Sequence, residues 1–228
     1  MKNDSRRIVV AIDGPAASGK SSTAHRVAER LGMHHGDSGA LYRAATVARL
    51  RDRRAGEPEQ WTAESVLSAA SRVAIVRNDS NFGVTLDGKS VGPELHEAAV
   101  TALVSLVAKM QPVRDWVNDQ MRRCARDGSI VVDGRDMGTT VFPEAQLKIF
   151  LVANANERAR RRLLQRLGRT PMDEEVAAEA EALKQRDAKD AAQTRQAPDA
   201  IVIDTTHLTQ DDQVDRIVEL ARKVISAS

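Results

Sequence analysis

The residues best suited to chemistry lie near the start of the chain, where a glycine-rich segment ends in a lysine and a serine. Residues 14–21 read GPAASGKS and match the spacing G-x-x-x-x-G-K-[ST] of a phosphate-binding loop. An apolar run at 7–12 precedes this segment and a helical pattern at 22–31 follows it, which is the strand-loop-helix context that such a loop requires. We therefore predict that the segment binds a nucleoside triphosphate.

The chemistry of this loop depends on its backbone. Gly14 and Gly19 allow successive N–H groups to turn toward phosphate oxygens, and the helix beginning near Lys20 points the positive end of its dipole at the same place. Lys20 is expected to reach the β- and γ-phosphates, and Ser21 to ligate Mg²⁺. The residues expected to contact the nucleotide are Gly14, Pro15, Ala16, Ala17, Ser18, Gly19, Lys20, Ser21 and Ser22.

The motif alone leaves GTPases, ATPases and kinases open, so a second half of the site must decide between them. Two further segments carry aspartates and arginines directly after predicted strands: DSGALYR at 37–43 and VDGRDMG at 132–138. Open α/β sheets bind ligands at the carboxyl ends of their parallel strands, where both segments are expected to lie. Arg43 and Arg135 suit bidentate contact with an acceptor phosphate, and Asp133 could hold Mg²⁺ through water.

The elements that must position these residues alternate along the chain. Short apolar, β-branched runs indicate buried strands at 7–12, 129–132, 147–152 and 200–203, and a fifth strand is predicted at 33–36. Helical patterns occupy 22–31, 100–126, 156–167 and 211–225. This alternation predicts an α/β protein with the P-loop NTPase fold and a doubly wound, five-stranded parallel sheet.

One stretch departs from the alternation. Residues 72–91 carry two turn clusters, NDSN and LDGK, between short β-prone runs, which predicts a small antiparallel meander. So short a stretch cannot bury a core of its own, so we interpret it as an insertion. We expect one domain over 1–228, with an insertion at about 61–112 and a helical lid at about 155–186.

The composition limits the functional classes. The 34 basic and 32 acidic residues leave a net charge of +2, too small to predict whole-surface attraction to nucleic acid or membrane. The single Cys124 excludes an internal disulfide and a zinc site built from thiolates, which suits a reducing compartment. The sequence shows no signal peptide and no apolar run long enough to cross a bilayer, so we predict a cytoplasmic location.

Four segments together resemble the bacterial cytidylate kinase family: IDGPAASGKSS, DSGALYRA, VVDGRDMGTTVFPEAQLKIFLVA and QRDAKD. The resemblance covers nearly the whole chain, and DGRDMGTTVFP is its most distinctive block. It implies an enzyme that moves the γ-phosphoryl group of ATP, with Mg²⁺, to CMP or dCMP, giving CDP or dCDP and ADP. It also implies that the antiparallel insertion belongs to the monophosphate-binding region.

The resemblance also implies roles for individual residues. Ser38, Ser105, Arg114 and Asp136 match family residues around the cytosine, and Arg43 and Arg135 match arginines on the phosphate side. Arg186 and Asp190 match ribose and phosphate contacts. Taken singly, each could be a cap or a surface charge, but the order and spacing of the set favour a site.

The segment 158–169 contains six arginines. The resemblance suggests that Arg158 and Arg162, one turn apart, belong to a mobile lid that closes on the triphosphate. The residues implied in catalysis are then Lys20, Arg135, Arg158, Arg162 and Arg186. We interpret Arg166 and Arg169 as solvated charges, and we do not expect nucleic-acid binding because no stacking aromatics accompany the run.

The chain departs from the family pattern at three positions. Gln193 stands where a third basic residue is usual, which makes Arg195 a candidate substitute; His96 replaces an arginine, and Ala17 lies in the loop. Two alternatives remain open: a kinase of another monophosphate such as UMP or AMP, and an ATP-binding regulator without transfer activity. We expect only small nucleotides (CMP, dCMP and ATP) as partners, no nucleic acid or membrane, and a monomer.

Overall fold

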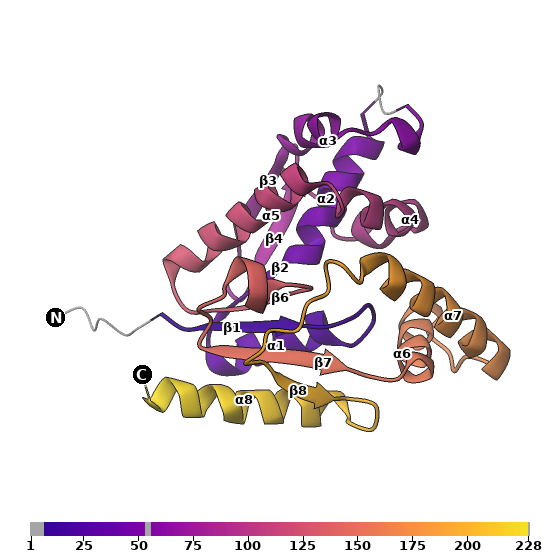
Figure 1. The fold of residues 1–228 in the computed structure, drawn as a ribbon. Helices are drawn as coiled ribbons and strands as arrows, with labels where there is room; N and C mark the ends of the chain where they lie inside the picture. Colours follow the sequence, from indigo (N-terminus) through magenta and orange to yellow (C-terminus); the bar gives the residue numbers. More distant parts are fainter. Residues whose placement is uncertain (1–6, 53–55, 228) are drawn as a thin grey trace. The chain divides into compact units, whose positions relative to one another are not determined.

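The computed structural model describes residues 7–52 and 56–227, and the chain forms two compact units (Figure 1). The first unit comprises the chain up to Met33 and from Ser129 onward, and the second spans His34–Gly128. Each unit has its own hydrophobic clusters. They are therefore described separately.

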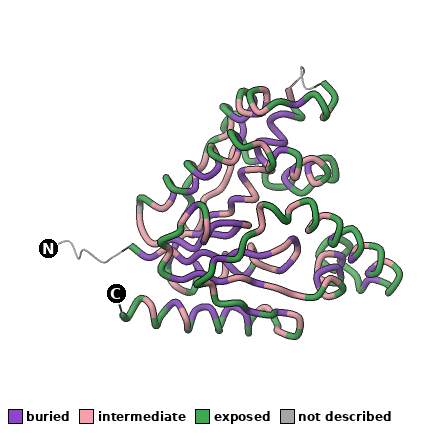
Figure 2. Tube along the Cα trace, viewed as in Figure 1, coloured by how far each residue is buried: buried purple, intermediate pink, exposed green. Residues whose placement is uncertain are grey.

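The main sheet has five strands in the order β2-β6-β1-β7-β8. Their bounds are β1 Val9–Asp13, β2 His34–Asp37, β6 Ile130–Gly134, β7 Leu147–Val152 and β8 Ile201–Asp204. Parallel ladders join β1 to β6 and to β7, and join β7 to β8. Strands β1 and β6 are buried along almost all of their length, as their apolar runs predict, and each run is followed by an aspartate (Figure 2). The predicted α/β architecture with a five-stranded parallel sheet is confirmed.

Four helices complete the first unit: α1 Lys20–Leu31, α6 Ala155–Leu167, α7 Asp173–Asp190 and α8 Gln210–Ala227. The apolar faces of α1 and α8 share one core with strands β1, β7 and β8. Helices α6 and α7 form a second cluster that encloses Ala16 of the glycine-rich loop. Asn154 starts α6 by accepting a hydrogen bond from the Glu157 N–H at 2.8 Å. A single π-helical turn, η4 (Met137–Val141), lies between β6 and β7.

The second unit combines helices with a small sheet. Strands β3 Val73–Arg77, β4 Phe82–Leu86 and β5 Lys89–Ser90 pair antiparallel, which confirms the predicted meander. Its helices are α2 Ser38–Leu50, α3 Ala63–Ala70, α4 Ala98–Val107 and α5 Gln111–Cys124, with short turns η1 Pro58–Gln60, η2 Glu94–His96 and η3 Ala125–Asp127.

The continuous helix predicted over 100–126 is wrong. The structure has two helices there, because α4 ends at Val107 and α5 begins at Gln111. Met110 has an extended backbone, and Pro112 occupies the first turn of α5, where a missing N–H costs no helical hydrogen bond. Across the described ranges, no helix combines the length and the apolar character needed to cross a membrane.

Candidate active site

The glycine-rich loop follows β1 and curls where its backbone angles demand it. Gly14 has φ 155°, and a Cβ atom there would lie 2.3 Å from the Leu151 carbonyl oxygen of β7, so only glycine fits. Gly19 has φ 88° just before α1, and Ala17 has φ 57°, an uncommon conformation for a residue with a side chain. The backbone therefore turns sharply between β1 and α1, as the motif predicts.

Three cationic side chains converge on consecutive carbonyl oxygens of this loop. Arg135 donates to the Gly14 oxygen at 2.7 Å, Lys20 Nζ to the Pro15 oxygen at 3.0 Å, and Arg158 to the Ala16 oxygen at 3.0 Å. The structure thus brings the predicted residues Lys20, Arg135 and Arg158 together around the loop. Such a concentration of positive charge suits an anionic ligand.

Buried polar atoms without partners lie in the same region. Ser18 Oγ and Arg158 Nε have no hydrogen-bond partner among the residues that the structure describes, and Arg186 Nε lies 3.7 Å from the Asp190 carboxylate. Ser18 is fully buried, and Arg158 is 6% exposed. Buried donors are usually satisfied, so donors of this kind suit a ligand that supplies acceptor atoms. Phosphate oxygens are acceptors of the required kind, and the site therefore fits the triphosphate that the loop predicts.

A hydroxyl and a carboxylate meet beside the loop. Ser21 is the second residue of α1, and its Oγ donates to the Asp133 carboxylate at 2.5 Å. Asp133 is 1% exposed and lies on β6, which β1 pairs with directly. Oxygen ligands of these two types are those that Mg²⁺ prefers, so this pair fits the predicted metal-binding role.

Helix α7 contributes a chain of ion pairs to the same region. Asp187 pairs with Arg158 at 2.7 Å and accepts from the Ala16 N–H at 3.4 Å. Asp190 pairs with Arg135 at 3.5 Å and with Arg186 at 3.7 Å. Burial, followed by the charge of Arg135, lowers the pKa of Arg186. The predicted residues Arg135, Arg186 and Asp190 therefore form one cluster.

The predicted lid arginine Arg162 has a different environment from Arg158. It pairs with Glu179 of α7 at 3.3 Å, and burial lowers its pKa. Arg166 pairs with the same carboxylate at 3.2 Å, but its side chain is 56% exposed against 27% for Arg162. Arg169 pairs with Glu175 at 2.6 Å on the exposed surface. In this structure only Arg158 of the two predicted lid arginines contacts the loop itself.

Three residues in the first unit were missed by the sequence reasoning. Asp13 accepts hydrogen bonds from the backbone of the η4 turn, Asp187 holds Arg158, and Arg161 donates to the oxygens of Thr205 and Leu208. Asp13 carried one available signal: an acidic residue at the end of a buried strand needs a specific partner. The partners of Asp187 and Arg161 lie far away in sequence, so no local pattern marked them.

Of the remaining predicted residues, Asp136 is 4% exposed and directly precedes η4 in the first unit, and the other four lie in the second unit. Ser38, buried, begins α2; Ser105 is half-buried on α4; and Arg114 on α5 donates to the Ala108 oxygen at 3.3 Å. Arg43 donates to the Leu95 oxygen at 2.9 Å and to Thr101 Oγ1 at 3.2 Å, tying α2 to η2 and α4. Burial, followed by the charge of Arg43, lowers the pKa of His96.

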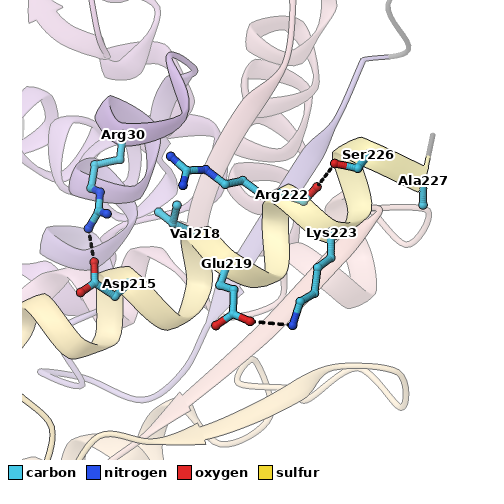
Figure 3. Close-up of a pocket in the computed structure, with 8 residues that line it drawn as sticks. All are labelled: Arg30, Asp215, Val218, Glu219, Arg222, Lys223, Ser226 and Ala227. Carbon is cyan, nitrogen blue, oxygen red and sulfur yellow. Dashed lines mark hydrogen bonds and ion pairs between the residues drawn. The ribbon is translucent and has the colours of Figure 1, made fainter.

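A cavity of about 700 Å³ lies along α8 and contains no residue of the glycine-rich loop (Figure 3). Its walls carry both charge signs, with two ion pairs, Arg30 with Asp215 and Lys223 with Glu219 at 2.6 Å, and the further cation Arg222. Figure 3 shows Arg30 of α1 facing Asp215 of α8, and Glu219 facing Lys223 along α8. Because none of the residues that line it belongs to the glycine-rich loop, this cavity is not the predicted nucleotide site.

The family model and three curated relatives that match this chain all carry cytidylate kinase in their descriptions. A family model described as cytidylate kinase matches residues 10–223. A cytidylate kinase of Chlorobaculum tepidum is 38% identical over 97% of this chain and 96% of its own length. A cytidylate kinase of Geobacillus kaustophilus is 43% identical over 96% of this chain and 99% of its own length. A bifunctional pantoate ligase/cytidylate kinase of a Synechococcus strain is 40% identical over 98% of this chain but only 42% of its own length.

Proposed function

Because the chain belongs to the cytidylate kinase family, we propose that its glycine-rich loop and surrounding cations carry out the transfer of the ATP γ-phosphoryl group to CMP or dCMP. The products are ADP and CDP or dCDP. The observation that carries this proposal is the convergence of Lys20, Arg135 and Arg158 on three consecutive loop carbonyls, beside buried donors that lack partners.

The loop and Lys20 are proposed to hold the β- and γ-phosphates of ATP. The start of α1 presents free backbone N–H groups and the positive end of the helix dipole, and both favour a bound phosphate. Ser21 and Asp133 would hold Mg²⁺, which supplies neutralisation of the phosphate charge that develops during transfer. The buried Ser18 hydroxyl, which has no hydrogen-bond partner among the described residues, would donate to a phosphate oxygen.

The chemical step needs no protein nucleophile or general base. The acceptor phosphate of a nucleoside monophosphate is already anionic at neutral pH, so its oxygen attacks once it is aligned and its repulsion with ATP is neutralised. Arg135, Arg158 and Arg186 supply that neutralisation. Each must exchange a protein partner for a phosphate oxygen, and charge-assisted bonds to phosphate are strong enough to drive the exchange. Closure of the lid that carries Arg158 and Arg162 would exclude water as a competing acceptor.

The acceptor side of the proposal rests on the family pattern. Ser38, Ser105, Arg114 and Asp136 are proposed to read the cytosine edge, Arg43 and Arg135 to bind the monophosphate, and Arg186 and Asp190 to bind ribose and phosphate. Support comes from Asp136, which is 4% exposed, and from the two ion pairs that prearrange Asp190. A cytoplasmic location, a monomeric state and an interaction with nucleotides alone stay predictions.

The purified full-length chain tests this function directly. ADP formation from ATP and Mg²⁺ is measured with CMP, dCMP, UMP, AMP and GMP in parallel. CMP and dCMP should give higher kcat/KM than UMP, because a mismatched base edge leaves the buried polar groups that read it unpaired. Equal values for CMP and UMP would contradict the base-reading roles without contradicting the kinase.

Lys20→Ala tests the role of the loop and serves as the inactive reference for these assays. Removing a group that stabilises the transferring charge typically costs several kcal/mol, so turnover should fall by roughly 10²-fold or more while the circular dichroism spectrum stays unchanged. Near-normal turnover in a folded Lys20→Ala protein would refute the role of the loop. ATP binding without ADP formation in the presence of any monophosphate would support the regulator alternative instead.

A further inference from the structure

Asp13 is a buried carboxylate that no step of the proposed transfer uses. It is the last residue of β1, is 3% exposed, and directly precedes Gly14 of the glycine-rich loop. Burial raises the pKa of Asp13 to about 6. Burying a carboxylate costs free energy unless the carboxylate has hydrogen-bond partners. The partners of Asp13 are backbone N–H groups.

The two oxygens of this carboxylate bind two successive amides. Asp13 Oδ1 accepts from the Met137 N–H at 2.9 Å, and Oδ2 accepts from the Gly138 N–H at 2.8 Å. Met137 and Gly138 open the η4 turn, whose first N–H groups lack partners within the turn. A Cβ atom added at Gly138 would lie 3.5 Å from Asp13 Oδ2 and 3.3 Å from the Lys148 side chain. The backbone at Gly138 is thus closely packed between the two.

This contact bears on the residues just before the turn. Arg135 and Asp136 directly precede Met137, and Arg135 also donates to the Gly14 oxygen at 2.7 Å. The strand end and the loop therefore hold this segment at two points, one on each side of Asp136. The carboxylate of Asp13 fixes the backbone, and the Gly14 carbonyl fixes the guanidinium.

The charges that face Asp13 are few. Lys20 at the start of α1 favours the ionised carboxylate, whereas Asp136 disfavours it. On the neighbouring strand β7, Lys148 is occupied by the Pro143 oxygen at 2.5 Å and by Asp199 at 3.0 Å. On β6, Asp133 lies opposite Ile12 and accepts from Ser21. Among the residues that the structure describes, the direct hydrogen bonds to Asp13 are thus those from Met137 and Gly138.

We propose that Asp13 is a positioning residue for phosphoryl transfer: its carboxylate holds the backbone of Met137 and Gly138 so that Arg135 and Asp136 are correctly placed against the phosphate loop. This inference rests on the proposed kinase function. It predicts that Asp13 affects the use of the acceptor rather than the binding of the donor nucleotide.

The test is Asp13→Asn in the full chain. Asparagine has nearly the same shape but offers one acceptor oxygen, so one of the two backbone bonds is lost. We expect kcat/KM for CMP to fall by roughly 10- to 100-fold, as small misplacements of reacting groups do, while the dissociation constant for ADP is unchanged. Hydrogen–deuterium exchange at the amides of Met137 and Gly138 should become faster, whether or not substrate is present.

Asp212→Asn is the matched control. Its carboxylate also accepts a backbone N–H, from Thr209 at 3.0 Å, but on the exposed start of α8. This variant should keep the parent kinetics and the parent exchange at 137–138.

Unchanged CMP kinetics in a folded Asp13→Asn protein would overturn the proposal. An equal loss of ADP affinity and CMP turnover would also overturn it, because Asp13 would then shape the loop alone. Unchanged exchange at Met137 and Gly138 would contradict its geometric basis. A parent protein without kinase activity would refute the proposed function instead, and the exchange measurement would still report on the Asp13 contact.

Discussion

The Ser21 hydroxyl donates a 2.5 Å hydrogen bond to the Asp133 carboxylate, which joins the start of α1 to β6. The two residues are 112 positions apart in the sequence, and each was predicted from a different motif. Parallel pairing of β1 with β6 brings the two motifs to the same edge of the sheet, because both strands end there. The proposed Mg²⁺ site depends on this meeting of a hydroxyl and a carboxylate.

Changing either member of this pair should raise the Mg²⁺ requirement of the reaction. Asp133→Asn removes the charge and Ser21→Ala removes the hydroxyl, and loss of a group that holds or orients a metal typically costs 10- to 100-fold in metal affinity. The initial rate at saturating ATP and CMP, measured against free Mg²⁺, should shift to higher concentration by roughly that factor. Superimposable Mg²⁺ curves for parent and variants would remove both residues from the metal site.

Arg162 and Arg166 form a matched pair because both bind Glu179. Arg162→Ala should lower kcat by roughly 10²-fold if its guanidinium stabilises the transferring charge. Arg166→Ala should change stability and turnover by less than about 0.5 kcal/mol, as expected for an exposed ion pair. Steady-state kinetics and thermal unfolding of both variants decide the question. Equal kinetic effects would mean that the two arginines act through Glu179 and the packing of α6 on α7.

Gln193 and Arg195 test the departure from the family pattern. The Arg195 N–H donates to the Arg135 oxygen at 3.1 Å, and its exposed side chain donates from Nε to the Ala192 oxygen at 3.2 Å. If Arg195 supplies the third cation, Arg195→Ala should raise KM for CMP, whereas Gln193→Ala should not, because a neutral amide lacks the charge-assisted bond. Unchanged KM and kcat in Arg195→Ala would show that the acceptor site works without a basic residue from this segment.

The titration of Asp13 should appear in the stability of the protein. Its pKa in the folded state is about 6, above the ordinary value of 3.8, so the folded chain binds this proton more tightly than the unfolded chain. The stabilising contribution of the proton is therefore complete below pH 3.8 and is lost as the pH rises through 6, by about 3 kcal/mol in total.

Asp13→Asn cannot lose this proton, so its unfolding free energy should lack that decline. The difference in unfolding free energy between Asp13→Asn and the parent should therefore move in favour of the variant between about pH 4 and about pH 7. Urea unfolding at several pH values measures it. Parallel stability profiles for the two proteins would show that the pKa of Asp13 is not raised by folding.

Much of the fold follows from local patterns. The strand predicted at 147–152 matches β7, and those at 7–12, 129–132 and 200–203 match β1, β6 and β8 to within two residues at each end. Strands β1, β6 and β7 are largely buried, so their apolar runs leave a plain signal. The predicted burial of the strand at 200–203 is wrong: β8 lies at the end of the sheet order, and only Ile203 is buried. The break at 108–110 was missed because the apolar pattern runs on through it. Helix α3 was also missed, although Thr62 and Ser65 form a capping box at its start.

The loop was easier to predict than the contacts around it. The glycine, lysine and serine positions are fixed by spacing along one turn, whereas the Asp187–Arg158 and Arg161–Thr205 contacts join distant segments. The resemblance already separated Arg162 from the solvated Arg166, but their shared partner Glu179 became visible only with the packing of α6 on α7. Pairing between helices of this kind depends on tertiary packing rather than on periodicity.

The chain has two tryptophans, Trp61 and Trp116, and both lie in the second unit, packed against the same apolar cluster. The Arg49 guanidinium carbon lies 5.5 Å from the centre of the Trp61 ring, and Trp61 is 6% exposed. Intrinsic tryptophan emission is therefore an optical signal of the second unit alone, while the unit that carries the glycine-rich loop is silent. During unfolding, fluorescence would follow His34–Gly128, and circular dichroism would follow the helices of both units. A comparison of the two signals would reveal whether the units melt together, without any added label.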